Sequence, residues 1–145
     1  MTSFIETLKD LMIEKDLSQV ALSKKLEVKP PTVTRYIKGK QLPNVEMAVK
    51  IANLFNCTLD YLFGIKDNND KEEFHTYPAF NVRFAFLLDY FNENIVHISL
   101  NSDIAKSAMY DWRNGAKTPT MDSIIKLAAY FKCSIDFVIG RVEFE

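Results

Sequence analysis

The stretch VKPPTVTRYIKGKQLPN, residues 28–44, places two prolines before a short run that suits a helix and closes that run with a glycine and a third proline. Proline disfavours helical geometry at the residue before it, so we expect Lys29 and Pro30 to be extended. Pro31 suits the first position of a helix. The stretch therefore predicts a short helix that starts at Pro31 or the next residue and ends near Gly39.

Four further short helices are expected around this run in the first 66 residues. The first carries apolar side chains at helical spacing, namely Phe4, Leu8, Leu11 and Met12. Its opposite face carries a charged stripe, namely Glu6, Asp10 and Glu14. The other three helices each follow a residue that can cap a helix, namely Ser18, Asn44 and Thr58. The helix after Ser18 is expected to turn Val20, Leu22 and Leu26 inward.

The chain repeats this pattern at an offset of 76 residues. IANLFNCTLDYLFG (51–64) aligns without gaps with LAAYFKCSIDFVIG (127–140), and IAKSAMYDWRNGAKTPT (104–120) aligns with the stretch at 28–44. Two copies around a polar segment indicate two domains, because a solenoid usually needs about three repeats. We therefore expect an all-α protein with two tandem five-helix domains. Their expected bounds are 1–66 and 80–145, with a linker at 67–79.

Composition limits the class of protein. The chain has 145 residues, 48% of them apolar and 26% charged, which is typical of a globular protein. Its apolar runs are far shorter than the ~20 residues of a membrane span, and it opens without a signal-peptide pattern, so we expect a cytoplasmic protein. Cys57 and Cys133 have no second cysteine or histidine at metal-ligand spacing, so we expect buried free thiols and no metal.

Charge is distributed unevenly along the chain. Residues 1–66 hold 10 basic and 7 acidic side chains, for +3, whereas residues 67–79 hold 1 and 4, for −3, and residues 80–145 hold 7 and 8, for −1. The basic excess is thus confined to the first copy. An excess of this size is also common on an ordinary solvated surface, so it does not indicate a nucleic-acid partner by itself.

The first copy resembles a known family. LSQVALSKKLEVKPPTVTRYIKGKQLPNVEMAVKIANLFNCTLDYLFG is similar to the Xre helix-turn-helix family of phage repressors, Cro proteins and their bacterial relatives. The resemblance rests on Ser18 and Gln19 opening the second helix, Val28 in the turn, and the spacing of Gly39 and Pro43. The second copy matches well only from Gly115 onward. The resemblance implies a sequence-specific, double-stranded-DNA-binding transcriptional regulator, a repressor above all, encoded by a bacterium or phage and associated with the nucleoid.

The residues of the first copy suit that function. The third helix of such a domain, here residues 31–38, enters the major groove, and its first turns reach base edges. Its outward polar set is Thr32, Thr34, Arg35 and Lys38, with Lys29 just before and Lys40 just after. Arginine can pair with guanine at two points, and threonine offers a hydroxyl and a methyl group that suits thymine. Ser18, Gln19 and Asn44 lie at helix starts, where free N–H groups suit a phosphate.

The second copy departs from this set at several positions. Lys29, Arg35 and Lys40 are replaced by Ala105, Asp111 and Ala116. Gln19 is replaced by Ile95, which we expect to be exposed on the DNA side. The polar side chains that remain are Lys106, Ser107, Tyr110, Arg113, Asn114 and Lys117. Contact between the second copy and DNA is therefore expected to be weakened but is not excluded.

The first helix of the second copy gains apolar residues. The charged stripe of the first copy is replaced by Val82, Phe86 and Tyr90, so this helix is apolar nearly all round. An exposed stripe of this kind is unusual on a monomer. We expect it to join two chains as a homodimer that reads two half-sites ~34 Å apart. The alternative is that the stripe docks the two domains of one chain.

Two other functions stay open. Both domains could read half-sites in tandem, because a 13-residue linker can stretch to about 45 Å. An adaptor or antirepressor could instead keep the fold and bind protein rather than DNA. His75 and His97 lack a ligand spacing and are expected to face solvent, and no phosphate loop or catalytic triad is recognisable, so we expect no enzyme. No cofactor or small-molecule ligand is expected.

Overall fold

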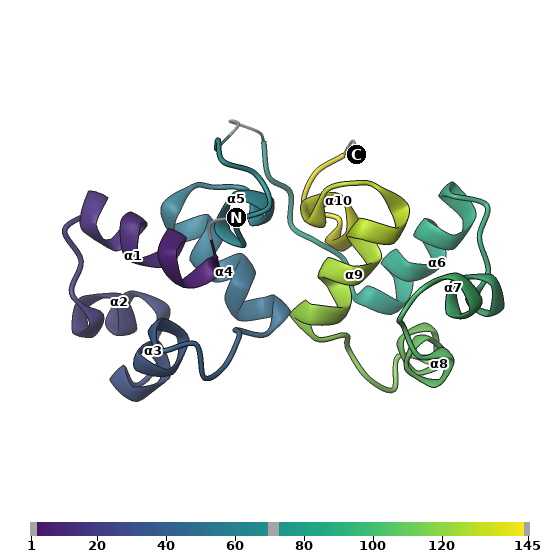
Figure 1. The fold of residues 1–145 in the computed structure, drawn as a ribbon, viewed down its shortest axis with the longest axis horizontal. Coiled ribbons are helices and arrows are strands. Elements are labelled where there is room, and N and C mark those ends of the chain that lie inside the picture. The colour runs from purple at the N-terminus through teal and green to yellow at the C-terminus, as the bar shows by residue number, and fades with distance from the viewer. Residues whose placement is uncertain (1–2, 70–72, 144–145) are drawn as a thin grey trace. The chain divides into compact units, whose positions relative to one another are not determined.

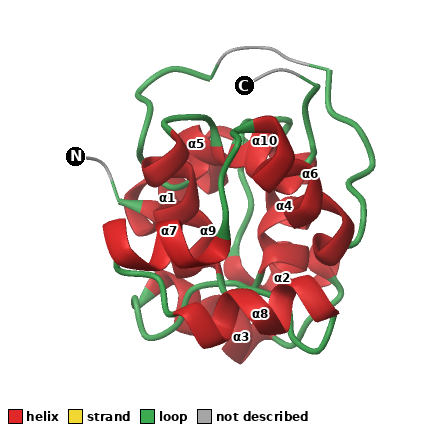
Figure 2. Ribbon diagram, turned by 90° about the vertical axis from the view of Figure 1, so that its right-hand side faces the viewer, coloured by secondary structure: helices red, strands yellow, loops and turns green. Residues whose placement is uncertain are grey.

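The described part of the protein is helical. The computed structural model describes residues 3–69 and 73–143, which form ten helices and no strand. The all-α class is confirmed, and Figure 2 shows these helices joined by loops. The chain divides into two compact units of five helices each, residues 1–71 and 72–145 (Figure 1). No helix of the described residues is long and apolar enough to cross a membrane.

The first unit contains the five short helices expected from the sequence. They are α1 (Phe4–Glu14), α2 (Gln19–Leu26), α3 (Pro30–Ile37), α4 (Val45–Phe55) and α5 (Leu59–Leu62). The three predicted N-caps are confirmed, because the side-chain oxygens of Ser18, Asn44 and Thr58 each accept a hydrogen bond from the N–H three residues on. Each such bond satisfies a backbone donor that has no partner inside the helix.

The core of the first unit lies between these helices. Leu8, Leu22, Val33, Ile51 and Leu62 are fully buried, at 0% exposure. Burial of a side chain of this size contributes about 1.5 to 3 kcal/mol, so these five are a large part of what holds so small a unit together.

Two predictions for the first unit were wrong in detail. Val20 is 52% exposed, because α2 packs through the face of Leu22 and Leu26 and Val20 lies on its other side. α3 begins at Pro30 rather than Pro31, after an extended Lys29. Both prolines fit the first turn because the first N–H groups of a helix have no intrahelical acceptor.

The second unit repeats the helix order of the first. Its helices are α6 (Phe80–Tyr90), α7 (Ile95–Asn101), α8 (Lys106–Asn114), α9 (Met121–Phe131) and α10 (Ile135–Ile139). Each begins 76 residues after its counterpart in the first unit. The apolar face of α6 that packs on the unit is only partly buried: Phe84 and Leu87 are inaccessible, whereas Phe80 and Leu88 are half-buried.

A polar cluster distinguishes the second unit from the first. Tyr130 donates its hydroxyl proton to Glu93 at 2.6 Å, and the other carboxylate oxygen of Glu93 lies 2.6 Å from Nδ1 of His97. Desolvation alone would raise the pKa of Glu93, but the bonds to Tyr130 and His97 hold this pKa below its ordinary value. Burial and the bond to Glu93 raise the pKa of Tyr130 to about 12. The cluster ties the turn after α6 to α7 and α9, where the first unit has leucine and alanine.

Residues of the expected linker, 67–79, make contacts with both units. The side-chain amide of Asn69 accepts from the Thr58 N–H and donates to the Asn56 carbonyl, both at 3.1 Å. The backbone N–H of His75 donates to the carbonyl of Arg141 at 2.7 Å. The guanidinium of Arg141 lies 3.7 Å from the ring centre of Phe74. Residues on both sides of the unit boundary therefore belong to the packed units.

The expectations for cysteine and histidine hold in part. Cys57 is a buried thiol as expected, whereas the thiol of Cys133 is only half-buried. His75 and His97 are both exposed. No group of three or more His, Cys, Asp and Glu side chains that could hold a metal ion occurs in residues 3–69 and 73–143.

Candidate nucleic-acid interface

α3 separates an inner face from an outer one. Val33 is 0% exposed and Tyr36 is 3% exposed, and the Tyr36 ring meets the edge of Phe4 of α1 at 6.4 Å between ring centres. Arg35 and Lys38 are exposed on the other side of the helix. The buried pair fixes the rotation of α3 against the core, so its basic side chains face solvent.

The end of α3 depends on a glycine. Gly39 has φ +72°, and a Cβ atom there would lie 2.8 Å from Cδ1 of Ile5. The left-handed backbone favours glycine at this position, and any larger residue would have to push the end of the Ile5 side chain aside. The next N–H, of Lys40, donates to the carbonyl of Arg35 at 3.0 Å. The chain therefore turns sharply after Lys38 and keeps Lys40 beside the helix.

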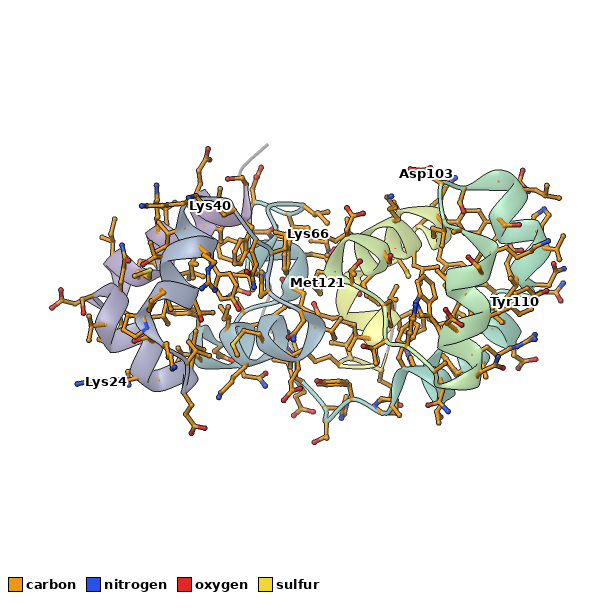
Figure 3. The ribbon with its side chains drawn as sticks, turned by 90° about the horizontal axis from the view of Figure 1, so that it is seen from below. Lys24, Lys40, Lys66, Asp103, Tyr110 and Met121 are labelled. Carbon is orange, nitrogen blue, oxygen red and sulfur yellow. The ribbon has the colours of Figure 1, made fainter. Side chains whose placement is uncertain are left out.

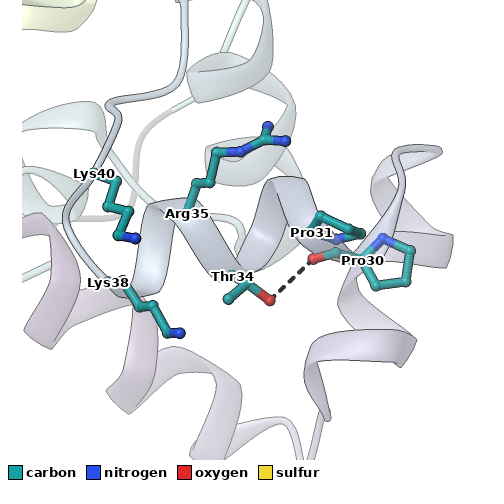
Figure 4. Close-up of a pocket in the computed structure, with 6 residues that line it drawn as sticks. All are labelled: Pro30, Pro31, Thr34, Arg35, Lys38 and Lys40. Atoms are coloured by element: carbon teal, nitrogen blue, oxygen red, sulfur yellow. Dashed lines mark hydrogen bonds between the residues drawn. The ribbon is translucent and has the colours of Figure 1, made fainter.

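The outer face of α3 borders a shallow hollow of about 390 Å³ (Figure 4). Its lining consists of Pro30, Pro31, Thr34, Arg35, Lys38 and Lys40. Three of the six side chains are cationic and none is acidic. A surface with this balance favours an anionic partner over a cationic or neutral one.

A hydrogen bond joins α3 to the start of α2. The hydroxyl of Thr34 lies 2.9 Å from Oε1 of Gln19 and 3.2 Å from the carbonyl oxygen of Pro30, the contact drawn in Figure 4. Oε1 of Gln19 is an acceptor in this contact, so its amide N–H groups stay available to a ligand. The structure thus brings together two predicted site residues that are 15 positions apart.

The remaining predicted residues of the first unit lie around α3. Ser18 and Asn44 are exposed and use their side-chain oxygens as caps, which leaves the N–H groups of the first helical residues pointing outward. Lys29 is exposed at the N-cap position of α3. The side chain of Lys40 lies at the surface of the unit (Figure 3). Thr32 is half-buried on the flank of α3 and is the least accessible of the set.

Sequence reasoning missed Pro31. It is exposed and lines the hollow, four residues before Arg35 and seven before Lys38. The i, i+4 and i+7 spacing places all three on one side of a helix, and this spacing was the signal that could have found it. The proline pair was interpreted only as a start signal for the helix.

The second unit corrects one expectation about its DNA side. Ile95 is 3% exposed and belongs to the core, not to the surface. The next residue of α7, Val96, is 46% exposed and takes the outward position. The replacement of Gln19 by Ile95 therefore removes a polar group from this surface, and the replacing side chain itself is buried.

Two pairs of polar side chains in and just after α8 contact each other. The guanidinium of Arg113 lies 4.8 Å from the ring centre of half-buried Tyr110. Nζ of Lys117 lies 3.9 Å from a carboxylate oxygen of Asp111. Arg113 also occupies the position of Ile37, on the opposite flank of the helix from the position of Arg35. Lys106 and Ser107 are exposed at the start of α8.

The apolar stripe of α6 is exposed. Val82, Phe86 and Tyr90 have exposed fractions of 59%, 43% and 49%. The rings of Phe86 and Tyr90 stack at 5.5 Å, and the second ring also meets Phe137 at 5.2 Å. The guanidinium of Arg83 lies 4.4 Å from the ring centre of Phe86, and burial lowers the pKa of this arginine. The two aromatic side chains are thus held in place at the surface.

Comparison with known proteins identifies the first unit. Residues 8–62, which run from α1 to α5, match a family described as helix-turn-helix. A crystal structure of a transcriptional regulator from Listeria innocua is similar, with 24% sequence identity, a TM-score of 0.41, and coverage of 67% of this chain and 83% of that chain. No curated protein matches the chain. The first unit is a helix-turn-helix domain.

Proposed function

We propose that the chain is a sequence-specific DNA-binding transcriptional regulator, and a repressor, that inserts α3 into the major groove. The observation that carries this proposal is the outer face of α3, where Pro31, Thr34, Arg35 and Lys38 line one hollow above a buried Val33 and Tyr36. A helix placed in this way fits the major groove, and an arginine on its outer face can pair with the O6 and N7 atoms of guanine.

Phosphate groups on either side of the groove would hold α3 in register. The N-termini of α2 and α4 carry Gln19 and Asn44, and Lys29 and Lys40 lie at the two ends of α3. Helix N-termini and lysines both bind phosphate oxygens, which fixes position without reading sequence. Sequence preference is therefore assigned to α3 alone.

Selection of bound sequences from random DNA at two salt concentrations tests this function. Lys29, Lys38 and Lys40 are expected to contact three phosphates, which corresponds to a slope of log affinity against log salt of about −2.7 for each bound copy. An adaptor that binds protein through an apolar surface would select no sequence and show no such slope. A single selected half-site would indicate a single reader, and an inverted pair would indicate a two-fold dimer. A direct pair would indicate tandem reading by both units.

Replacement of Arg35 by alanine should weaken binding to the selected site by about 1 to 3 kcal/mol and relax the base preference at one position. Arg113→Ala is the matched control, since Arg113 stacks on Tyr110 and lies at a different helical position. Titration of both variants against the selected site and a scrambled site measures the effect. Equal losses would assign DNA reading to both units, and an unchanged Arg35 variant would remove that residue from the reading role.

The second unit is proposed as a divergent copy that serves self-association. Its five helices keep the 76-residue offset, but α8 lacks counterparts of Lys29, Arg35 and Lys40, and Lys117 lies beside an acidic residue. Its α6 instead exposes Val82, Phe86 and Tyr90 where α1 has Glu6, Asp10 and Glu14. A two-fold axis can place such a stripe against itself, which gives a homodimer with two copies of α3.

A further inference from the structure

The outer face of α3 has an apolar end. Pro30 and Pro31 are exposed at the first two positions of this eight-residue helix. They line the same hollow as the cationic side chains of Arg35, Lys38 and Lys40 (Figure 4). A polyanion bound over this hollow would therefore meet hydrocarbon at one end of α3 and positive charge at the other.

The first turn of α3 offers no backbone donor to a ligand. Proline has no N–H, so the first two positions donate nothing. The third N–H, of Thr32, already donates to the carbonyl of Lys29 at 3.0 Å. The first turn of α3 therefore cannot bind a phosphate through backbone N–H groups in the usual way, whereas the N-termini of α2 and α4 can. What the first turn can contribute is the surface of its proline rings.

Among unmodified bases, the apolar group in the major groove is the C5-methyl group of thymine, and 5-methylcytosine presents the same group. Pro31 precedes Arg35 by four residues, which corresponds to a rise of about 6 Å along the helix. Base pairs follow one another at about 3.4 Å. A base edge that meets Pro31 therefore lies one or two base pairs from the guanine that Arg35 would contact.

We propose that Pro31 is a specificity residue that reads the C5-methyl group of a pyrimidine one or two base pairs from the guanine paired with Arg35. This inference rests on the proposed DNA-binding function. Pro31 is exposed, whereas Thr34 is half-buried and its hydroxyl is bonded to Gln19, so the proline ring is the more accessible apolar group.

Replacement of thymines by deoxyuridine tests the inference with the full chain and the selected site. At one thymine near the Arg35-dependent guanine, removal of the methyl group is expected to lower the affinity of the protein for the site about three- to tenfold. A site with 5-methylcytosine at that position should bind more tightly than a site with cytosine there, by a similar factor. If every deoxyuridine substitution leaves the affinity unchanged while specific binding persists, the inference is wrong and the proposed function stands.

Variants of the two prolines assign the methyl contact. Pro31→Ser should abolish the difference in affinity between sites with thymine and sites with deoxyuridine but keep the guanine preference. The fold should be kept because an exposed ring is replaced and no core contact is lost. Pro30→Ser is the matched control and should keep the difference. Circular dichroism confirms that both variants stay helical, and Pro31→Ala provides a second replacement that suits a helix. A full methyl effect in both Pro31 variants would overturn the assignment, and failure to select any sequence would overturn the proposed function with it.

Discussion

Replacement of Asp136 by alanine is expected to destabilise the second unit by about 3 to 5 kcal/mol. Nη1 of Arg141 donates to Oδ1 of Asp136 at 2.7 Å, and their side chains are 0% and 2% exposed. Removal of the carboxylate leaves a guanidinium in the interior without its counter-charge, and an unpaired buried charge costs far more than an intact pair contributes. Because small domains are stable by only about 5 to 15 kcal/mol, this loss is a large part of the total.

Thermal unfolding followed by calorimetry measures the effect. Only the transition of the second unit should move, because Asp136 and Arg141 both lie within it. Asp122→Ala is the control, since Asp122 forms an ion pair with Lys126 at 3.3 Å in which the side chains are 68% and 40% exposed. Exposed pairs contribute little, so this variant should unfold close to the parent. Equal shifts in the two variants would contradict a structural role for the buried pair.

Much of the fold could be predicted from the sequence because its signals are local. Ser18, Asn44 and Thr58 each accept a bond from a group three residues away, so the starts of α2, α4 and α5 depend on neighbours in the chain. The start of α3 was predicted one residue late. The preference for an extended residue before proline applies to Pro30, but the first turn of a helix accepts two prolines in succession.

Side-chain direction near a helix start was harder to predict. Val20 and Ile95 both lie within the first two positions of a helix, yet the first is 52% exposed and the second 3%. Too few residues precede these positions to define an apolar face by periodicity. Packing against the rest of the unit decides which side chain turns inward.

Contacts between distant residues could not be predicted at all. Thr34 meets Gln19 across 15 positions, and Arg141 packs on Phe74, which belongs to the segment that reads as a polar linker. Neither contact has a sequence pattern, because it depends on how the helices pack. The composition of residues 67–79 predicts a linker, but it does not reveal that Asn69 contacts the first unit and Phe74 the second.

Replacement of Phe86 and Tyr90 by glutamate is expected to convert a dimer into monomers. Both side chains are nearly half exposed and stack at 5.5 Å, so charges here would be buried against a second apolar stripe at high cost. The fold tolerates carboxylates at these positions, since Asp10 and Glu14 are their counterparts in α1. Light scattering measures the mass, and circular dichroism checks that helicity is kept.

The same change should weaken binding to a paired site about 10²- to 10⁴-fold, because two linked readers gain from effective concentration, whereas binding to a single half-site should change little. Val82→Glu tests the stripe at a 59% exposed side chain that lies apart from the aromatic pair. Leu100→Glu is the matched control, since Leu100 is 78% exposed on α7 and lies outside the stripe. A monomeric parent, or equal dissociation of the Leu100 variant, would contradict a dimer through α6 and favour docking of the stripe within one chain.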